Sequence, residues 1–124
     1  MDTARGLIVV MTGSALGGGA RFLLQQAATR TFSTALPVGT IAINVVGSFL
    51  LVLVLQVPSL SSTTRLFLTT GVLGGFTTYS SFNFETIALV QDGHTGLAVA
   101  NVAITLVACL FGGLCAVGLG RAIA

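Results

Sequence analysis

The chain has 124 residues, of which 54% are hydrophobic and only 6% are charged. A soluble domain averages roughly 25% charged residues, so this composition predicts a membrane protein. The sequence has no cluster of basic residues that could bind phosphates, and we therefore expect no nucleic-acid partner. The length accommodates about four membrane-spanning helices of roughly 20 residues each, with no room for a separate soluble domain.

The hydrophobic segments predict a single all-α membrane domain with four transmembrane helices, at residues 4–28, 38–57, 65–91 and 96–121. The first segment has an arginine before an apolar run, as a signal peptide does. It continues without a clear polar cleavage region, so we expect it to remain as a span.

The first span carries two features that an ordinary apolar helix lacks. The spacing Gly13-x-x-x-Gly17 lets helices approach closely, and simple packing is its usual role. Arg21 lies inside the apolar segment, where a charge is costly and usually faces a partner or water. The alternative is that the Arg21 side chain extends to the membrane surface. Its position alone favours neither reading.

The second span is apolar except for Thr40, Asn44 and Ser48. These residues lie at i, i+4 and i+8, so they form one stripe on one helix face. An Asn amide inside a membrane needs hydrogen-bond partners, and a neighbouring helix commonly supplies them. The stripe, with Gly47 beside it, favours a wet or ion-facing surface.

The third span is organised around residues 71–85. Three glycines within five residues weaken its helix, because glycine loses more backbone entropy than alanine does. Hydroxyl and aromatic side chains follow, and then Glu85. In lipid, freed backbone groups persist only where protein or water satisfies them. The pattern therefore predicts a helix broken mid-membrane, with carbonyls available to a cation and an aromatic and hydroxyl face beyond the break.

The fourth span carries Asn101, Thr105 and Cys109 at the same i, i+4, i+8 spacing, which predicts a packed helix with one faintly polar track. Cys109 and Cys115 lie six residues apart on one helix, with about 9 Å of rise between them. That separation excludes an intrahelical disulfide. His94 is expected in a loop, and a single histidine without a second ligand nearby argues against a metal site.

The charges orient the predicted spans only weakly. Four spans place both chain ends on one side, which would carry three arginines, against one or two on the other side. A chain with so little bias can insert in both orientations. The two halves of the sequence are not repeats of each other, so any inverted arrangement must come from two copies of the chain.

Catalysis is hard to build from one histidine, two mid-helix cysteines and three acids, so we expect no enzyme. A polar lining with aromatic residues suits the passage of a small ion. The ring edges of Tyr79 and Phe82 are positive and could face an anion, and Arg21 in a vestibule would attract one. A cation route would more typically carry acidic rings, for which only Glu85 qualifies. The alternative is that the aromatic side chains are ordinary core packing.

Three segments of the sequence resemble the Fluc (CrcB) family of fluoride channels. They are residues 18–22 (Gly-Gly-Ala-Arg-Phe), residues 37–47 (Pro-Val-Gly-Thr-Ile-Ala-Ile-Asn-Val-Val-Gly) and residues 69–85, which contain Gly-Gly-Phe-Thr-Thr-Tyr-Ser-Ser-Phe. The third segment is highly specific and the first two support it. The resemblance covers essentially the whole chain.

The resemblance implies an antiparallel, dual-topology homodimer with two fluoride pores and one central, structural sodium ion. The implied sodium ligands are the backbone carbonyls of Gly74 and Thr77 at the break in the third span. Asn44 matches the pore asparagine of the family, and its two pore phenylalanines fall at Tyr79 and Phe82.

Arg21 and Glu85 match the arginine and the glutamate that the family has in its first and third spans. We expect the hydroxyls of Ser80, Ser81 and Thr105 to replace part of the hydration shell of fluoride.

Two departures from the family pattern concern conduction rather than fold. Tyr79 stands where the family has phenylalanine, and its hydroxyl would either donate to fluoride or narrow the passage. Cys109 and Gly113 stand where the family often has serine and threonine. Both departures leave open a heterodimer in which a related chain completes each pore.

The function implied by the resemblance is passive, selective export of fluoride across the cytoplasmic (inner) membrane, which would protect the cell from fluoride. The implied partners are fluoride, the lipid bilayer and a second copy of the chain. One rival is a small four-span drug/proton antiporter, although that class resembles a pattern with a membrane glutamate in the first span, which is missing here. The other rival is a non-conducting subunit of a larger assembly or heterodimer.

Overall fold

The computed structural model describes residues 1–123, and within that range the chain is helical and contains no strand. The all-α prediction is therefore confirmed. The elements in chain order are α1 (Thr3–Thr31), α2 (Val38–Leu55), α3 (Ser62–Leu66), the π-helical segment η1 (Phe67–Leu73), α4 (Gly74–Phe76), α5 (Tyr79–Gln91) and α6 (Thr95–Ile123).

Three of these helices, α1, α2 and α6, are long and apolar enough to cross a membrane. A multi-pass membrane protein follows from them. The segment predicted as a further span, residues 65–91, is instead divided among shorter pieces, because helical structure is interrupted at Thr77 and Thr78. No single piece of this segment has the length of a spanning helix.

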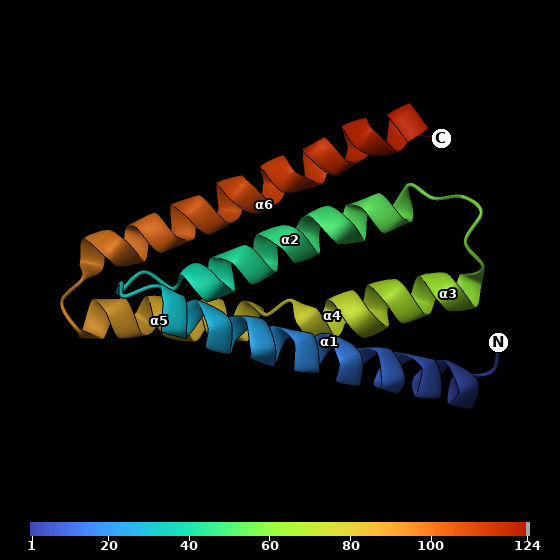
Figure 1. Ribbon diagram of the computed structural model, residues 1–124, viewed down its shortest axis with the longest axis horizontal. Coiled ribbons are helices and arrows are strands. Elements are labelled where there is room, and N and C mark those ends of the chain that lie inside the picture. The colour runs from blue at the N-terminus through green and yellow to red at the C-terminus, as the bar shows by residue number, and fades with distance from the viewer. Residues whose placement is uncertain (124) are drawn as a thin grey trace.

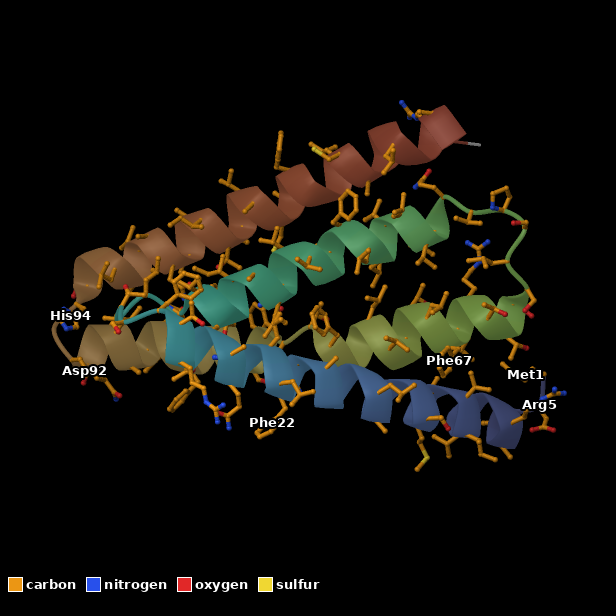
Figure 2. The ribbon with its side chains drawn as sticks, in the orientation of Figure 1. Met1, Arg5, Phe22, Phe67, Asp92 and His94 are labelled. Atoms are coloured by element: carbon orange, nitrogen blue, oxygen red, sulfur yellow. The ribbon has the colours of Figure 1, made fainter. Side chains whose placement is uncertain are left out.

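The helices lie side by side as long rods (Figure 1). α2 packs against α6, α1 packs against η1 and α4, and α5 packs against α6. α1 begins and α6 ends at the same end of the molecule. The turn between α5 and α6, with Asp92 and the exposed His94, lies at the opposite end from Met1 and Arg5 (Figure 2).

Glycines bring α1 into backbone contact with the third segment. A Cβ added at Gly13 would lie 2.8 Å from the Cα of Gly71, and one added at Gly75 would lie 2.6 Å from the carbonyl oxygen of Ser14. A Cβ at Gly17 would collide with the carbonyl oxygen of Val72. The packing interpretation of Gly13-x-x-x-Gly17 is therefore confirmed.

The core of the single chain is thin, and its outer faces are apolar. Ile43 and Ala116 are fully buried, whereas many large apolar side chains are more than half exposed. They cover the free faces of α1 and α6, as Leu23 and Leu110 do. Lipid or another protein surface has to cover these faces, because exposing such large apolar surfaces to water is unfavourable.

Candidate ion pathway

The break in the third segment lies two residues beyond its glycines. We expected the glycines to interrupt the helix, but the chain stays helical through Gly75 and becomes extended at Thr77 (φ −76°, ψ 156°) and Thr78 (φ −151°, ψ 108°). The Thr78 hydroxyl accepts a hydrogen bond from the backbone N–H of Ser81 at 3.1 Å. A threonine N-cap thus starts α5, which explains why the helix begins again at this point.

Asn44 on α2 pairs with the backbone of the break through both ends of its amide. Its Oδ1 accepts from the Thr78 N–H at 2.8 Å, and its Nδ2 donates to the Thr78 carbonyl at 3.0 Å. The Asn44 amide is therefore hydrogen-bonded by a neighbouring segment, which was one of the two expectations for this residue. Because an amide nitrogen has two protons, a second N–H of Asn44 is left for another partner.

The two carbonyls expected to hold sodium have lost their helical donors. In an unbroken helix the Gly74 carbonyl would accept from the N–H of Thr78, and the Thr77 carbonyl from that of Ser81. Those N–H groups donate to Asn44 and to the Thr78 hydroxyl instead. Carbonyl oxygens of an unwound segment suit a hard cation such as sodium.

A groove of about 770 Å³ lies between α2, the break, α5 and α6. Four of the predicted pore residues line it, namely Asn44, Tyr79, Phe82 and Thr105. The rest of its wall is largely apolar. It includes Cys109 and Gly113, the two departures from the family pattern in the fourth span.

Tyr79 and Phe82 meet at one side of this groove, with ring centroids 5.6 Å apart and planes tilted by 52°. This geometry is a favourable aromatic pair. Phe82 is 9% exposed, whereas Tyr79 is 78% exposed and stands clear of the chain. Much of the Tyr79 ring is therefore free to contact whatever occupies the groove.

A second cavity, the cleft, has a volume of about 550 Å³ and lies between α1, α2 and α5. It is lined by the other four predicted pore residues, Arg21, Ser80, Ser81 and Glu85. Thr40 donates to one Glu85 oxygen, Oε1, at 2.8 Å. The first and second positions of the polar stripe on α2 thus serve different cavities, since Asn44 faces the groove.

Thr78 lines both the cleft and the groove, and among the described residues it is the one that the two cavities share. It is 6% exposed. Its hydroxyl lies 3.0 Å from that of Ser81 and 3.3 Å from that of Ser80. A short row of hydroxyls therefore runs from the cleft to the point where the groove begins.

A third, smaller hollow of about 240 Å³ lies beneath the link between α1 and α2, and it shares Gln25 and Glu85 with the cleft. Within residues 1–122, Gln25 Oε1 and Glu85 Oε2 are buried acceptor atoms without a hydrogen-bond partner. A Cβ added at Gly39 would lie 2.6 Å from Gln25 Oε1, so the glycine leaves room for this side chain. A donor such as water has to hydrogen-bond to each of these oxygens, since a buried unpaired acceptor costs about 1–3 kcal/mol.

Two residues of this pathway were not among the predicted site residues. Thr78 was counted only as one hydroxyl of a run, although a threonine directly before a helical segment is a recognisable N-cap. Gln25 follows Arg21 by four residues and so shares its helix face. That spacing was the signal that could have identified it.

Comparison with known proteins identifies the family. The family model described as CrcB-like protein, Camphor Resistance (CrcB), matches residues 8–120. The chain belongs to this family. The resemblance found in the sequence is thereby confirmed, and with it the expectation that the chain is not an enzyme.

Curated relatives in the CrcB family are named fluoride-specific ion channel FluC. The relative from Anaeromyxobacter sp. is 49% identical over 108 residues, which make up 84% of this chain and 86% of that protein. The relative from Sorangium cellulosum is 48% identical over 106 residues, covering 82% and 84%. The relative from Ruminiclostridium cellulolyticum is 37% identical over 110 residues, covering 86% and 85%.

Proposed function

We propose that this chain forms a passive fluoride channel in the cytoplasmic membrane and lowers the fluoride concentration of the cell. The observation that carries the proposal is the pair of cavities that meet at Thr78, in a chain whose relatives are named fluoride-specific ion channels. The eight predicted pore residues divide four and four between these cavities.

Fluoride entering the cleft would meet Arg21, whose charge raises the local anion concentration. It would exchange water for the hydroxyls of Ser80 and Ser81 and pass Thr78 into the groove. Burying a bare anion costs tens of kcal/mol unless hydrogen bonds replace the water that it loses. A series of closely spaced donors meets that requirement.

In the groove, the second N–H of Asn44, the hydroxyl of Thr105 and the ring edges of Tyr79 and Phe82 supply the next positive groups. All of them are neutral. A site of neutral donors releases an anion more readily than a fixed positive charge does, as conduction demands. Thr78 stands between the two cavities, and a narrow passage there would exclude larger halides.

The Gly74 and Thr77 carbonyls would hold a structural sodium ion, and their loss of helical donors supports this assignment. Each copy supplies only two such oxygens, fewer than a hard cation binds. A second copy would supply the remainder. The site residues therefore support a dimer with the ion between its two breaks.

The second copy would be antiparallel and would cover the groove. Its wall includes side chains that are largely exposed in the single chain, such as Tyr79, Leu110 and Leu114. In this arrangement the segment Ser62–Gln91 would also cross the membrane, which gives four spans in all. Its break would lie inside the membrane, with the Gly74 and Thr77 carbonyls facing protein and not lipid. The weak charge bias is compatible with insertion in both orientations.

Fluoride efflux from liposomes that contain the purified full chain tests this function. A fluoride electrode should record fast release, and the same liposomes loaded with chloride should release little. A well-folded dimer that releases no fluoride would overturn the homodimeric channel and favour the heterodimer. Proton-driven drug uptake by the same liposomes would favour the antiporter instead.

Phe82→Ile provides the residue-level test. Isoleucine keeps an apolar side chain of moderate size but removes the positive ring edge, so fluoride release should fall by about tenfold or more while the dimer persists on size exclusion. Phe111→Ile is the matched control, because Phe111 is 65% exposed on α6 and lines neither the cleft nor the groove. Normal release from Phe82→Ile would contradict the assignment of this ring to the pore.

A further inference from the structure

The Thr105 hydroxyl donates to a side chain and not to the backbone, as that of Thr40 also does. Six threonines donate to the backbone carbonyl four residues earlier at 2.7 to 2.9 Å, namely Thr12, Thr29, Thr31, Thr69, Thr77 and Thr86. Thr105 donates instead to the side chain of Asn101, to Oδ1 at 3.4 Å. Its hydroxyl is therefore turned away from the backbone of its own helix.

Asn101 is fully buried, and α5 holds its amide in place. Its Nδ2 donates to the hydroxyl of Thr86 at 2.9 Å, and that hydroxyl donates to the Phe82 carbonyl at 2.7 Å. The chain of bonds thus joins α6 to α5 through a side chain that does not line the groove itself. Its two ends, Thr105 and Phe82, both line the groove.

The contact between Thr105 and Asn101 is the weak member of this chain. O–H···O bonds in proteins usually measure about 2.5–3.0 Å, and this one is 3.4 Å long. A hydrogen bond to an anion is shorter and roughly twice as strong as a neutral one. An anion in the groove can therefore replace Asn101 as the acceptor of the Thr105 hydrogen bond.

We propose that Asn101 is a positioning residue for anion passage: it holds the Thr105 hydroxyl off the backbone of α6, so that its proton can turn to an anion in the groove. When the anion leaves, the Thr105 hydroxyl donates to Asn101 Oδ1 again. The role rests on the proposed function, because it assumes that fluoride enters the groove.

Asn101→Leu tests the role in a double-mutant cycle with Thr105→Val, using the full chain in liposomes and a fluoride electrode. Leucine is similar in size but offers no acceptor, so Thr105 is free to donate to the carbonyl of residue 101, as the six other threonines do at their positions. We expect fluoride release to fall by about tenfold, equivalent to about 1.4 kcal/mol. In the Thr105→Val background, which has no hydroxyl to lose, the same substitution should change release by less than about twofold.

The cycle separates positioning from a merely structural role. If Asn101 only stabilises the bundle, Asn101→Leu lowers release by the same factor in both backgrounds, and the proposal fails. Release from Thr105→Val equal to that of the unmodified chain also overturns it. Thr12→Val is the matched control for Thr105→Val, because Thr12 is exposed and bonds only to its own helix. Release from Thr105→Ser should resemble that of the unmodified chain.

Asn101→Ala is the second variant, in case leucine prevents folding, as judged by size exclusion and thermal unfolding. Alanine also removes the acceptor of the Thr105 hydroxyl and should lower release, again only when the hydroxyl is present. The unmodified chain separates the two levels of inference. If it releases no fluoride, the proposed function fails; if it does and the cycle is additive, only the role of Asn101 fails.

Discussion

At the scale of single residues, Asn44 shows what the sequence can and cannot predict. The requirement that its amide be satisfied followed from its place in an apolar helix. Its partner did not follow, because that partner is the backbone of Thr78, which has free groups only where the third segment is broken. Local spacing cannot reveal a partner that depends on where another helix ends.

The two bonds of Asn44 predict a loss of stability as well as of conduction. Asn44→Ala leaves the N–H and the carbonyl of Thr78 unpaired, at about 1–3 kcal/mol for each buried group. We expect a clear fall in the thermal unfolding temperature, measured by circular dichroism in detergent, together with loss of fluoride release. Ser48→Ala, one turn further along the same stripe, is the control. Equal unfolding temperatures for the two variants would show that Asn44 does not hold the break.

At the scale of helices, the bounds were predictable and the position of the break was not. Hydrophobic runs predicted helices at residues 4–28, 38–57 and 96–121, and the structure has them within a few residues of those bounds. The glycines of the third segment were read as the break. In the structure Gly71 and Gly75 lie against α1. A glycine that permits close approach and a glycine that interrupts a helix look alike in a sequence.

Close approach of α1 predicts opposite behaviour for two neighbouring glycines. Gly17→Ala would force its Cβ into the Val72 carbonyl, so the helices must separate, at about 1–3 kcal/mol or more. A Cβ at Gly19 would meet no atom within 4 Å, so Gly19→Ala should be neutral or stabilising by up to about 1 kcal/mol. Thermal unfolding of the two variants measures the difference. If both unfold at the same temperature, α1 does not pack this closely.

At the scale of the whole molecule, the single chain is incomplete as a channel. Its groove is open, Tyr79 is largely exposed, and the Gly74 and Thr77 carbonyls have lost their helical donors. The sequence predicted eight pore residues, but it could not predict that they divide between two cavities, because that division arises from the packing of α2, α5 and α6 around Thr78. The open groove and the exposed Tyr79 support the proposed second copy.

A sodium ion bound between two copies predicts that sodium stabilises the dimer. Its unfolding temperature should rise with sodium concentration, because a ligand that binds only the folded state stabilises it by mass action. The measurement compares sodium buffer with a buffer of equal ionic strength in which a large organic cation, N-methylglucamine, replaces sodium. Equal unfolding temperatures and equal fluoride release in the two buffers would argue against a structural sodium ion.

Dual topology predicts that the turn between α5 and α6 lies on both sides of the membrane. In a variant carrying Asp92→Cys, Cys109→Ala and Cys115→Ala, a membrane-impermeant thiol reagent applied to intact cells should label about half of the protein. The remainder should react only after the membrane is opened. Labelling of all the protein, or of none, before that step would show a single orientation.

The position of Thr78 couples two properties that could otherwise evolve separately. Its hydroxyl caps the N-terminus of α5, and its side chain also forms the wall between the cleft and the groove. A substitution that widens the proposed passage for larger ions by removing this side chain would also remove the cap and loosen the first turn of the helix that carries Tyr79 and Phe82. Permissive variants at this position would therefore carry a folding defect, and natural selection for a stable protein would act indirectly to keep the passage narrow.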